Sequence, residues 1–181
     1  MINEILEHNK AFVKSKGYEN YNTTSKYPVK KIAIVSCMDT RLTELLPEAL
    51  GIKNGDAKII KNAGGIISHP FGSVIRSLLI GIYELDIQEI MVIGHTDCGA
   101  RYTDSQKIIE KMKARGITQK NIDLIKYFGI DFDSWLGGFM DLDFSIKKSV
   151  ELIRKHPLVP DEIIVNGFII DSITGELKKV I

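Results

Sequence analysis

Short β-branched runs alternate with amphipathic segments along most of the chain. The apolar runs, which suit strands covered on both faces, occupy residues 31–36, 57–61, 89–94 and 162–170. Between them, apolar side chains recur at helical spacing in residues 43–50, 74–85 and 144–155. This alternation predicts a doubly wound α/β fold, with a mostly parallel sheet of four or five strands and flanking helices. Residues 177–181 are expected to form a last, antiparallel edge strand.

The two less regular regions are predicted to add to this fold without dividing it. Residues 2–16 have apolar positions at helical spacing and precede a polar loop that reaches Pro28. Residues 103–127 are polar and are expected to be helical in pieces, with a break at Gly116, and 135–139 form an apolar loop. We therefore expect one α/β domain over 1–181, in which 1–28 is an N-terminal helical arm and loop.

Composition excludes some classes of partner. The 181 residues include 24 basic and 23 acidic side chains, a formal net charge of +1. Such a balanced chain is not expected to bind nucleic acid or an anionic membrane surface. It lacks an apolar run of about 18 residues, and its acidic N-terminus does not resemble a secretory signal. A cytoplasmic protein is predicted, in which two cysteines favour thiol or metal chemistry over a disulfide.

Three soft metal ligands follow two of the predicted strands. Cys37 ends the first strand, His95 ends the third, and Cys98 comes three residues later. In a parallel sheet the carboxyl ends of neighbouring strands meet at one edge, where ligands bind. A single buried cysteine is usually only a small apolar side chain, but the joint pattern indicates zinc. Because three protein ligands leave one tetrahedral position open, the pattern is typical of a catalytic site.

Asp39 and Arg41 follow Cys37 at alternate positions, so an extended segment would direct both to the metal side. Two thiolates cancel the charge of a zinc ion, and such a centre needs a further group to orient the attacking oxygen. A carboxylate held by arginine remains ionised and could do this. An ordinary exposed ion pair is the alternative.

Three motifs carry a resemblance to a known family. They are residues 37–41 (CMDTR), 61–64 (KNAG) and 94–99 (GHTDCG), with weaker similarity over 167–177. In their order and spacing the chain resembles the β-class carbonic anhydrases, particularly the short prokaryotic ones. The resemblance implies one Zn²⁺ per chain on Cys37, His95 and Cys98, and a catalytic dyad of Asp39 and Arg41.

The same resemblance implies an activity and an assembly. The activity is reversible hydration of carbon dioxide to bicarbonate and a proton, by hydroxide on the zinc. The assembly is a homodimer or a higher even oligomer of a zinc-binding domain, in which the arm of residues 1–28 packs on a partner subunit or on its own subunit. The glycine-rich loop formed by Asn62, Ala63, Gly64 and Gly65 is expected to wall the substrate pocket.

Three alternatives stay open at this point. The same zinc site could hydrolyse carbonyl sulfide or carbon disulfide, which are also linear, apolar electrophiles. The fold could be a non-catalytic bicarbonate-binding or zinc-binding module. The two cysteines could instead form a redox switch. His69 is predicted to be a loop histidine, and His8 and His156 are predicted to lie at the surface.

Overall fold

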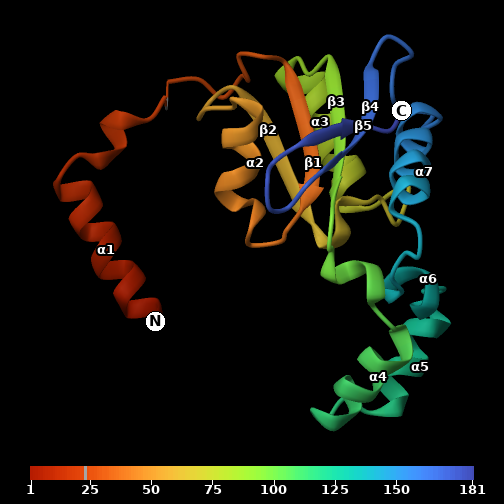
Figure 1. Cartoon of the computed structure of the whole chain (residues 1–181). Helices are drawn as coiled ribbons and strands as arrows, with labels where there is room; N and C mark the ends of the chain where they lie inside the picture. Colours follow the sequence, from red (N-terminus) through yellow and green to blue (C-terminus); the bar gives the residue numbers. More distant parts are fainter. Residues whose placement is uncertain (23) are drawn as a thin grey trace.

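Five strands form one sheet in the order β2-β1-β3-β4-β5 in the computed structural model, which describes residues 1–22 and 24–181 (Figure 1). The strands are β1 (Ile32–Cys37), β2 (Ala57–Asn62), β3 (Glu89–His95), β4 (Ile164–Ile170) and β5 (Leu177–Lys179). The first four are parallel and β5 is antiparallel to β4. The predicted α/β sheet is therefore confirmed, including its antiparallel edge.

Helices connect the strands and extend beyond them. They are α1 (Ile2–Lys14), α2 (Leu42–Leu50), α3 (Ser73–Leu85), α4 (Ser105–Ala114), α5 (Gln119–Tyr127), α6 (Phe132–Leu136) and α7 (Leu142–Arg154). Short 3-10 turns occur at η1 (Gly17–Asn20), η2 (Ala63–Gly65) and η3 (Gly99–Tyr102). The prediction of an apolar loop over 135–139 was wrong for Trp135 and Leu136, which lie in α6. Asp131 caps that helix by accepting hydrogen bonds from the N–H groups of Asp133 and Ser134.

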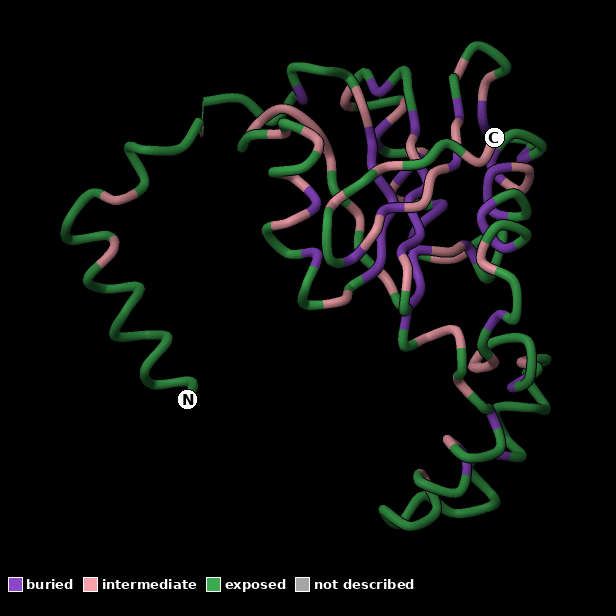
Figure 2. Tube along the Cα trace, in the orientation of Figure 1, coloured by how far each residue is buried: buried purple, intermediate pink, exposed green. Residues whose placement is uncertain are grey.

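Helices cover both faces of the sheet, as a doubly wound fold requires. On one face, α3 and α7 pack on β1, β3 and β4 through a cluster that includes Val35, Leu78 and Val150. On the other face, Leu42 and Leu46 of α2 pack on the opposite side of the same strands. Figure 2 shows the buried segments concentrated in the sheet and along the helix faces that contact it. Burial on both faces explains the continuous apolar runs of the strands.

Two segments lie away from this core. Helix α1 has no buried residue and stands apart from the sheet in Figures 1 and 2. Helices α4 to α6 extend from the end of the sheet beyond β3 and have a small core of their own, formed by Ile109, Ile122 and Phe132. None of the helices in the described part of the chain is long and apolar enough to cross a membrane.

His156 corrects a prediction, because it is buried at 4% exposure and not at the surface. Its Nδ1 accepts a hydrogen bond from the N–H of Leu158, and its Nε2 lies 3.0 Å from the carbonyl oxygen of Pro70. The aromatic ring of Phe71 packs against it at a centroid distance of 5.7 Å. The imidazole thus links two loops that are distant in sequence, which a reading of single residues could not reveal.

The strand order determines where on the sheet a ligand site is expected. From β1 the chain passes through α2 to β2 on one side, and then through α3 to β3 on the other side of β1. Such a reversal opens a crevice beyond the carboxyl ends of the two strands on either side of it, where ligands bind. Those strands are β1 and β3, which end at Cys37 and His95.

Candidate metal centre

Cys37, His95 and Cys98 converge at this point of the sheet. One candidate ligand atom from each lies within 4.8 Å of the others, and the two Sγ atoms are 3.8 Å apart. All three side chains are at most 5% exposed. Cys37 and His95 end their strands, and Cys98 joins them because the chain turns sharply into η3. The predicted juxtaposition of the three residues is therefore present in the fold.

The His95 ring is oriented for coordination through Nε2. Its Nδ1 lies 2.8 Å from the carbonyl oxygen of Thr96. A carbonyl can only accept a hydrogen bond, so Nδ1 carries the proton and Nε2 presents its lone pair. Nε2 is buried and has no hydrogen-bond partner among the described residues. A buried acceptor without a partner is costly, and a metal ion between this nitrogen and the two thiols would satisfy it. The donor set of two sulfurs and one imidazole fits zinc.

The two thiols differ in acidity. Burial raises the pKa of Cys37, but the neighbouring His95 ring and hydrogen bonds from two backbone N–H groups outweigh it and lower the pKa to about 7. Burial raises the pKa of Cys98 to about 11. Zinc binds thiolates, so binding at this centre would release protons, mainly from Cys98 near neutral pH.

Asp39 and Arg41 form a two-point pair beside the cluster. Arg41 donates from Nε to Oδ1 of Asp39 at 3.0 Å and from Nη2 to Oδ2 at 2.9 Å, and its backbone N–H also donates to Oδ1. These hydrogen bonds lower the pKa of Asp39 to about 2, so the carboxylate is ionised at neutral pH. Its Oδ2 lies 3.8 Å from Nε2 of His95. The carboxylate is therefore adjacent to the metal cluster while its arginine partner holds it.

Asp97 is a further member of this network that the sequence reasoning did not single out. Its carboxylate and its backbone carbonyl both accept hydrogen bonds from the Arg41 guanidinium, each at 2.9 Å. Asp97 has a left-handed backbone, with φ of 53°, in the turn between His95 and Cys98. Its position inside the GHTDCG motif is the only local signal for it, because the contact spans 56 residues of sequence.

The glycine loop packs against the metal-binding strands. Gly65 has φ of +65°, and a Cβ there would lie 2.8 Å from the backbone N of Cys37 and from the carbonyl oxygen of Ile93. Only glycine fits this close approach. The backbone of Gly64 hydrogen-bonds the thiol of Cys37, and a Cβ on Gly64 would meet Phe139 at 3.0 Å. The loop thus forms one side of the cluster, and Phe139, from the segment predicted to be an apolar loop, lies beside Gly64.

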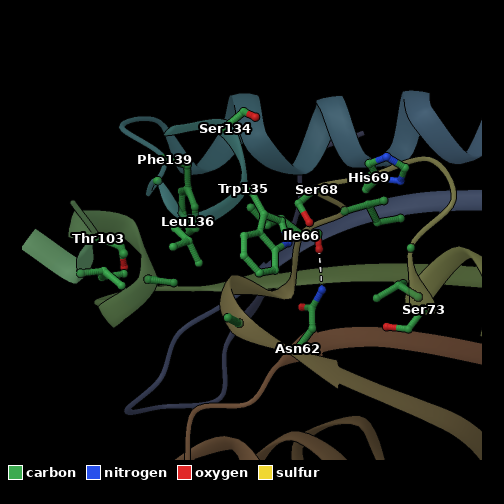
Figure 3. Close-up of a pocket in the computed structure, with 17 residues that line it drawn as sticks. Asn62, Ile66, Ser68, His69, Ser73, Thr103, Ser134, Trp135, Leu136 and Phe139 are labelled. Carbon is green, nitrogen blue, oxygen red and sulfur yellow. Dashed lines mark hydrogen bonds between the residues drawn. The ribbon is translucent and has the colours of Figure 1, made fainter. Parts of the chain in front are cut away.

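The first residues of this loop also line a cavity of about 550 Å³ (Figure 3). Asn62 and Ala63 line it, together with Ile66, His69, Trp135 and other residues. Gly64, Gly65 and the residues of the metal cluster and dyad are not among the described lining residues. The amide of Asn62 donates to the carbonyl of Ile66 at 2.6 Å, as the dashed line in Figure 3 marks, while its buried Oδ1 has no partner among the described residues. The loop therefore borders both the Cys37 thiol and a cavity with polar and apolar lining residues.

Comparisons with known proteins agree with this geometry. A family model described as carbonic anhydrase matches residues 32–177. The Bacillus subtilis protein named "Putative carbonic anhydrase YtiB" is 51% identical over 181 residues, which is 100% of this chain and 96% of that protein. A carbon disulfide hydrolase of Acidithiobacillus thiooxidans is 31% identical over 157 residues, covering 82% of this chain and 76% of that protein.

A solved structure extends the likeness to the whole fold. The crystal structure of β-carbonic anhydrase isoform I from Trichomonas vaginalis has a TM-score of 0.90 and 35% identity, and covers 100% of this chain and 97% of that chain. The family match over most of the chain, the sheet topology and the Cys–His–Cys cluster agree with one another. The chain belongs to the β-carbonic anhydrase family.

Proposed function

We propose that this protein catalyses the reversible hydration of carbon dioxide to bicarbonate and a proton, with one Zn²⁺ held by Cys37, His95 and Cys98. The observation that carries the proposal is the orphaned lone pair of His95 Nε2. It points into the same small space as two thiols, beside a carboxylate that arginine keeps ionised. A structural zinc site would be closed by a fourth protein ligand, whereas three ligands and an oriented carboxylate suit catalysis.

The chemistry divides between the metal and the protein. Zinc in such a site supplies a Lewis acid that makes hydroxide available near neutral pH. We assign to Asp39 the task of accepting a hydrogen bond from the attacking hydroxide oxygen, which aims a lone pair at the carbon of the substrate. Arg41 keeps that carboxylate ionised and in place through its two-point contact. Positioning of this kind converts a loosely bound pair of reactants into an aligned one.

We assign residues 62–65 to one wall of the substrate pocket. Carbon dioxide is small and apolar, so it needs an apolar contact and little hydrogen bonding. Ala63 and Gly64 offer small, uncharged surface, the Gly64 backbone lies against the Cys37 thiol, and Phe139 lies beside Gly64. Gly65 is assigned an indirect part, since it allows the loop to approach the backbone of β1.

The test is carbon dioxide hydration measured by stopped flow from pH 6 to 9, with zinc content determined on the same samples. We expect one zinc per chain and a hydration rate that depends on it, so that a chelator abolishes turnover and added zinc restores it. Zinc-loaded protein without hydration activity at alkaline pH would refute the proposal and favour a non-catalytic binding module. Isolation of a metal-free protein with a Cys37–Cys98 disulfide would favour a redox switch.

A second candidate activity rests on one specific observation, the similarity to a carbon disulfide hydrolase. Carbon disulfide and carbonyl sulfide are linear electrophiles that the same hydroxide could attack. The ligand set does not distinguish them from carbon dioxide. A sulfide-release assay beside the hydration assay, with both substrates at equal concentration, separates the activities. Faster turnover of carbon disulfide than of carbon dioxide would replace the first proposal.

We further propose that the protein is cytoplasmic and acts as a homodimer or a higher even oligomer in which α1 packs on a partner subunit. Ile2, Ile5, Leu6 and Val13 of α1 are all more than half exposed. An amphipathic helix of 13 residues is marginal in water without a surface to pack on. Residues 1–28 are then an arm, and the rest of the chain is one zinc-binding domain. The two unpaired cysteines suit a reducing compartment.

A further inference from the structure

The turn between His95 and Cys98 is held by a second turn that is distant in sequence. Residues 96 and 97 join the two candidate ligands, and residues 171–176 join β4 to β5. The two turns lie together because β3 and β4 are neighbouring parallel strands whose ends coincide, with His95 paired to Ile170. The β4–β5 turn therefore lies directly beside the metal cluster.

Thr96 is the point of contact between the two turns. Its Oγ1 accepts a hydrogen bond from the backbone N–H of Ser172 at 3.0 Å and donates to Oδ2 of Asp171 at 3.3 Å. The hydroxyl of Ser172, a residue only 5% exposed, lies 3.2 Å from Oγ1 of Thr96. The backbone N–H of Thr96 also donates to the carbonyl of Ile170. The side chain and the main chain of Thr96 are thus both tied to the β4 end.

Asp171 is itself held in place by hydrogen bonds within the β4–β5 turn. Oδ1 of Asp171 accepts hydrogen bonds from the N–H groups of Ile173 and Thr174, at 2.9 and 2.8 Å, and from the hydroxyl of Thr174 at 3.1 Å. The main chain closes the same turn through Gly175, whose N–H donates to the carbonyl of Asp171. One carboxylate oxygen of Asp171 therefore holds its own turn, which leaves the other to hold Thr96.

The fixed Thr96 in turn directs His95. The Thr96 carbonyl is the acceptor for Nδ1–H of His95, so its position sets both the tautomer and the angle of the ring. Partners of this kind around metal-binding histidines hold the ring and its proton in place. Arg41 holds the other residue of the turn, Asp97, but the Asp97 side chain is 79% exposed. That exposed ion pair contributes little, and the hydrogen bond from Arg41 to the Asp97 carbonyl does not involve Thr96. The contacts of Thr96, whose carbonyl accepts from His95, are therefore the more direct constraint on the ring.

We propose that Thr96, Asp171 and Ser172 are positioning residues for His95, so that the β4–β5 turn sets the zinc affinity of a centre from which it contributes no ligand. The inference rests on the proposed zinc site but concerns residues outside the ligand set and the dyad. The β4–β5 turn acts on His95 through one chain of contacts. These run from the Asp171 carboxylate and Ser172 to the Thr96 hydroxyl, and from the Thr96 carbonyl to the imidazole.

The test compares Thr96→Val with Thr96→Ser in the full-length protein. Valine keeps the shape of threonine and removes the hydroxyl's hydrogen bonds to Asp171 and Ser172, whereas serine keeps them. We expect Thr96→Val to bind zinc about 10- to 100-fold more weakly in competition with a chromophoric chelator, as is usual for the partners of metal-binding histidines. We expect Thr96→Ser to remain close to the wild type. Cobalt-substituted Thr96→Val should show altered d–d absorption bands, which report ligand geometry.

Thr118→Val is the matched control. The Thr118 hydroxyl also accepts a backbone N–H, at the start of α5 in the separate α4–α6 region. This variant should lose some thermal stability and keep wild-type zinc affinity and cobalt spectrum. If Thr96→Val shows the same pattern as this control, the hydroxyl has only a structural role and the inference is wrong.

Ser172→Ala provides a second route should Thr96→Val fail to fold. It removes one hydroxyl from the cluster and leaves the backbone N–H that Thr96 accepts. We expect a smaller but measurable loss of zinc affinity, and unchanged affinity would overturn the inference. Failure of the proposed function is distinguishable, because wild-type protein would then bind zinc without hydrating carbon dioxide, whatever the variants do.

Discussion

Asp39→Asn is the substitution that most directly tests the dyad. Asparagine has almost the same shape and keeps one oxygen acceptor for the backbone N–H and Nε of Arg41. Its amide NH₂, however, replaces the oxygen that accepts Nη2–H. Two donors then face each other, and the charge that the guanidinium neutralises is gone. The fold and the metal ligands are otherwise untouched.

The structure supplies the size of the effect on stability. The pKa of Asp39 is lowered from 3.8 to about 2, which corresponds to about 2–3 kcal/mol. The Arg41 side chain is 42% exposed, so solvent screening reduces this to about 1–2 kcal/mol. For a chain of this length we expect the melting temperature to fall by about 2–8 °C.

The pH dependence of this stability difference has a definite sign. The pKa of the folded state is depressed, so the contribution is complete above the unfolded pKa of about 4. It is lost only as the pH falls toward about 2. Between pH 6 and 8 the difference in melting temperature should therefore be constant.

The effect on turnover should be much larger than the effect on stability. A positioned proton acceptor typically contributes about 10²- to 10⁴-fold to a rate. We expect Asp39→Asn to retain one zinc per chain and to lose at least about 100-fold in kcat/KM for carbon dioxide, measured by stopped flow. Asp97→Asn is the matched control, since it changes the exposed partner of the same arginine. It should cost less than about 1 kcal/mol in transition-state stabilisation. A zinc-loaded Asp39→Asn enzyme that turns over at the wild-type rate would refute the assignment of Asp39.

Three further outcomes follow from the geometry. Cys98→Ser should lose most of its zinc on dialysis, because a hydroxyl is a poor soft ligand; full zinc content by atomic absorption would remove Cys98 from the site. Gly65→Ala should destabilise the protein by about 2–4 kcal/mol, through strain at positive φ and contact with the Cys37 backbone. A denaturant midpoint equal to that of the wild type would contradict that contact. Deletion of residues 2–14 should lower the sedimentation coefficient from that of a dimer toward that of a monomer. A sedimentation coefficient that still corresponds to a dimer would show that α1 does not hold the assembly together.

Local pattern was sufficient for most of the secondary structure and for naming the three candidate metal ligands that the fold brings together. Apolar runs and helical periodicity depend on neighbours within a few residues, so the strands and α2, α3 and α7 could be predicted to within a few positions. The convergence of Cys37 with His95 also followed, because parallel strands bring their carboxyl ends to one edge. The short helix α6 was missed, since five residues capped by Asp131 carry too little periodicity.

Contacts between distant segments were decided only by the tertiary structure. Nothing near Arg41 in sequence indicates that Asp97 is its second partner, and nothing near Thr96 indicates Asp171 and Ser172, 75 and 76 residues away. The burial of His156 likewise depends on loops from separate parts of the chain. Residue types and spacing specify which groups can bind zinc. The hydrogen-bond partners that orient those groups depend on how the strand ends and loops pack together.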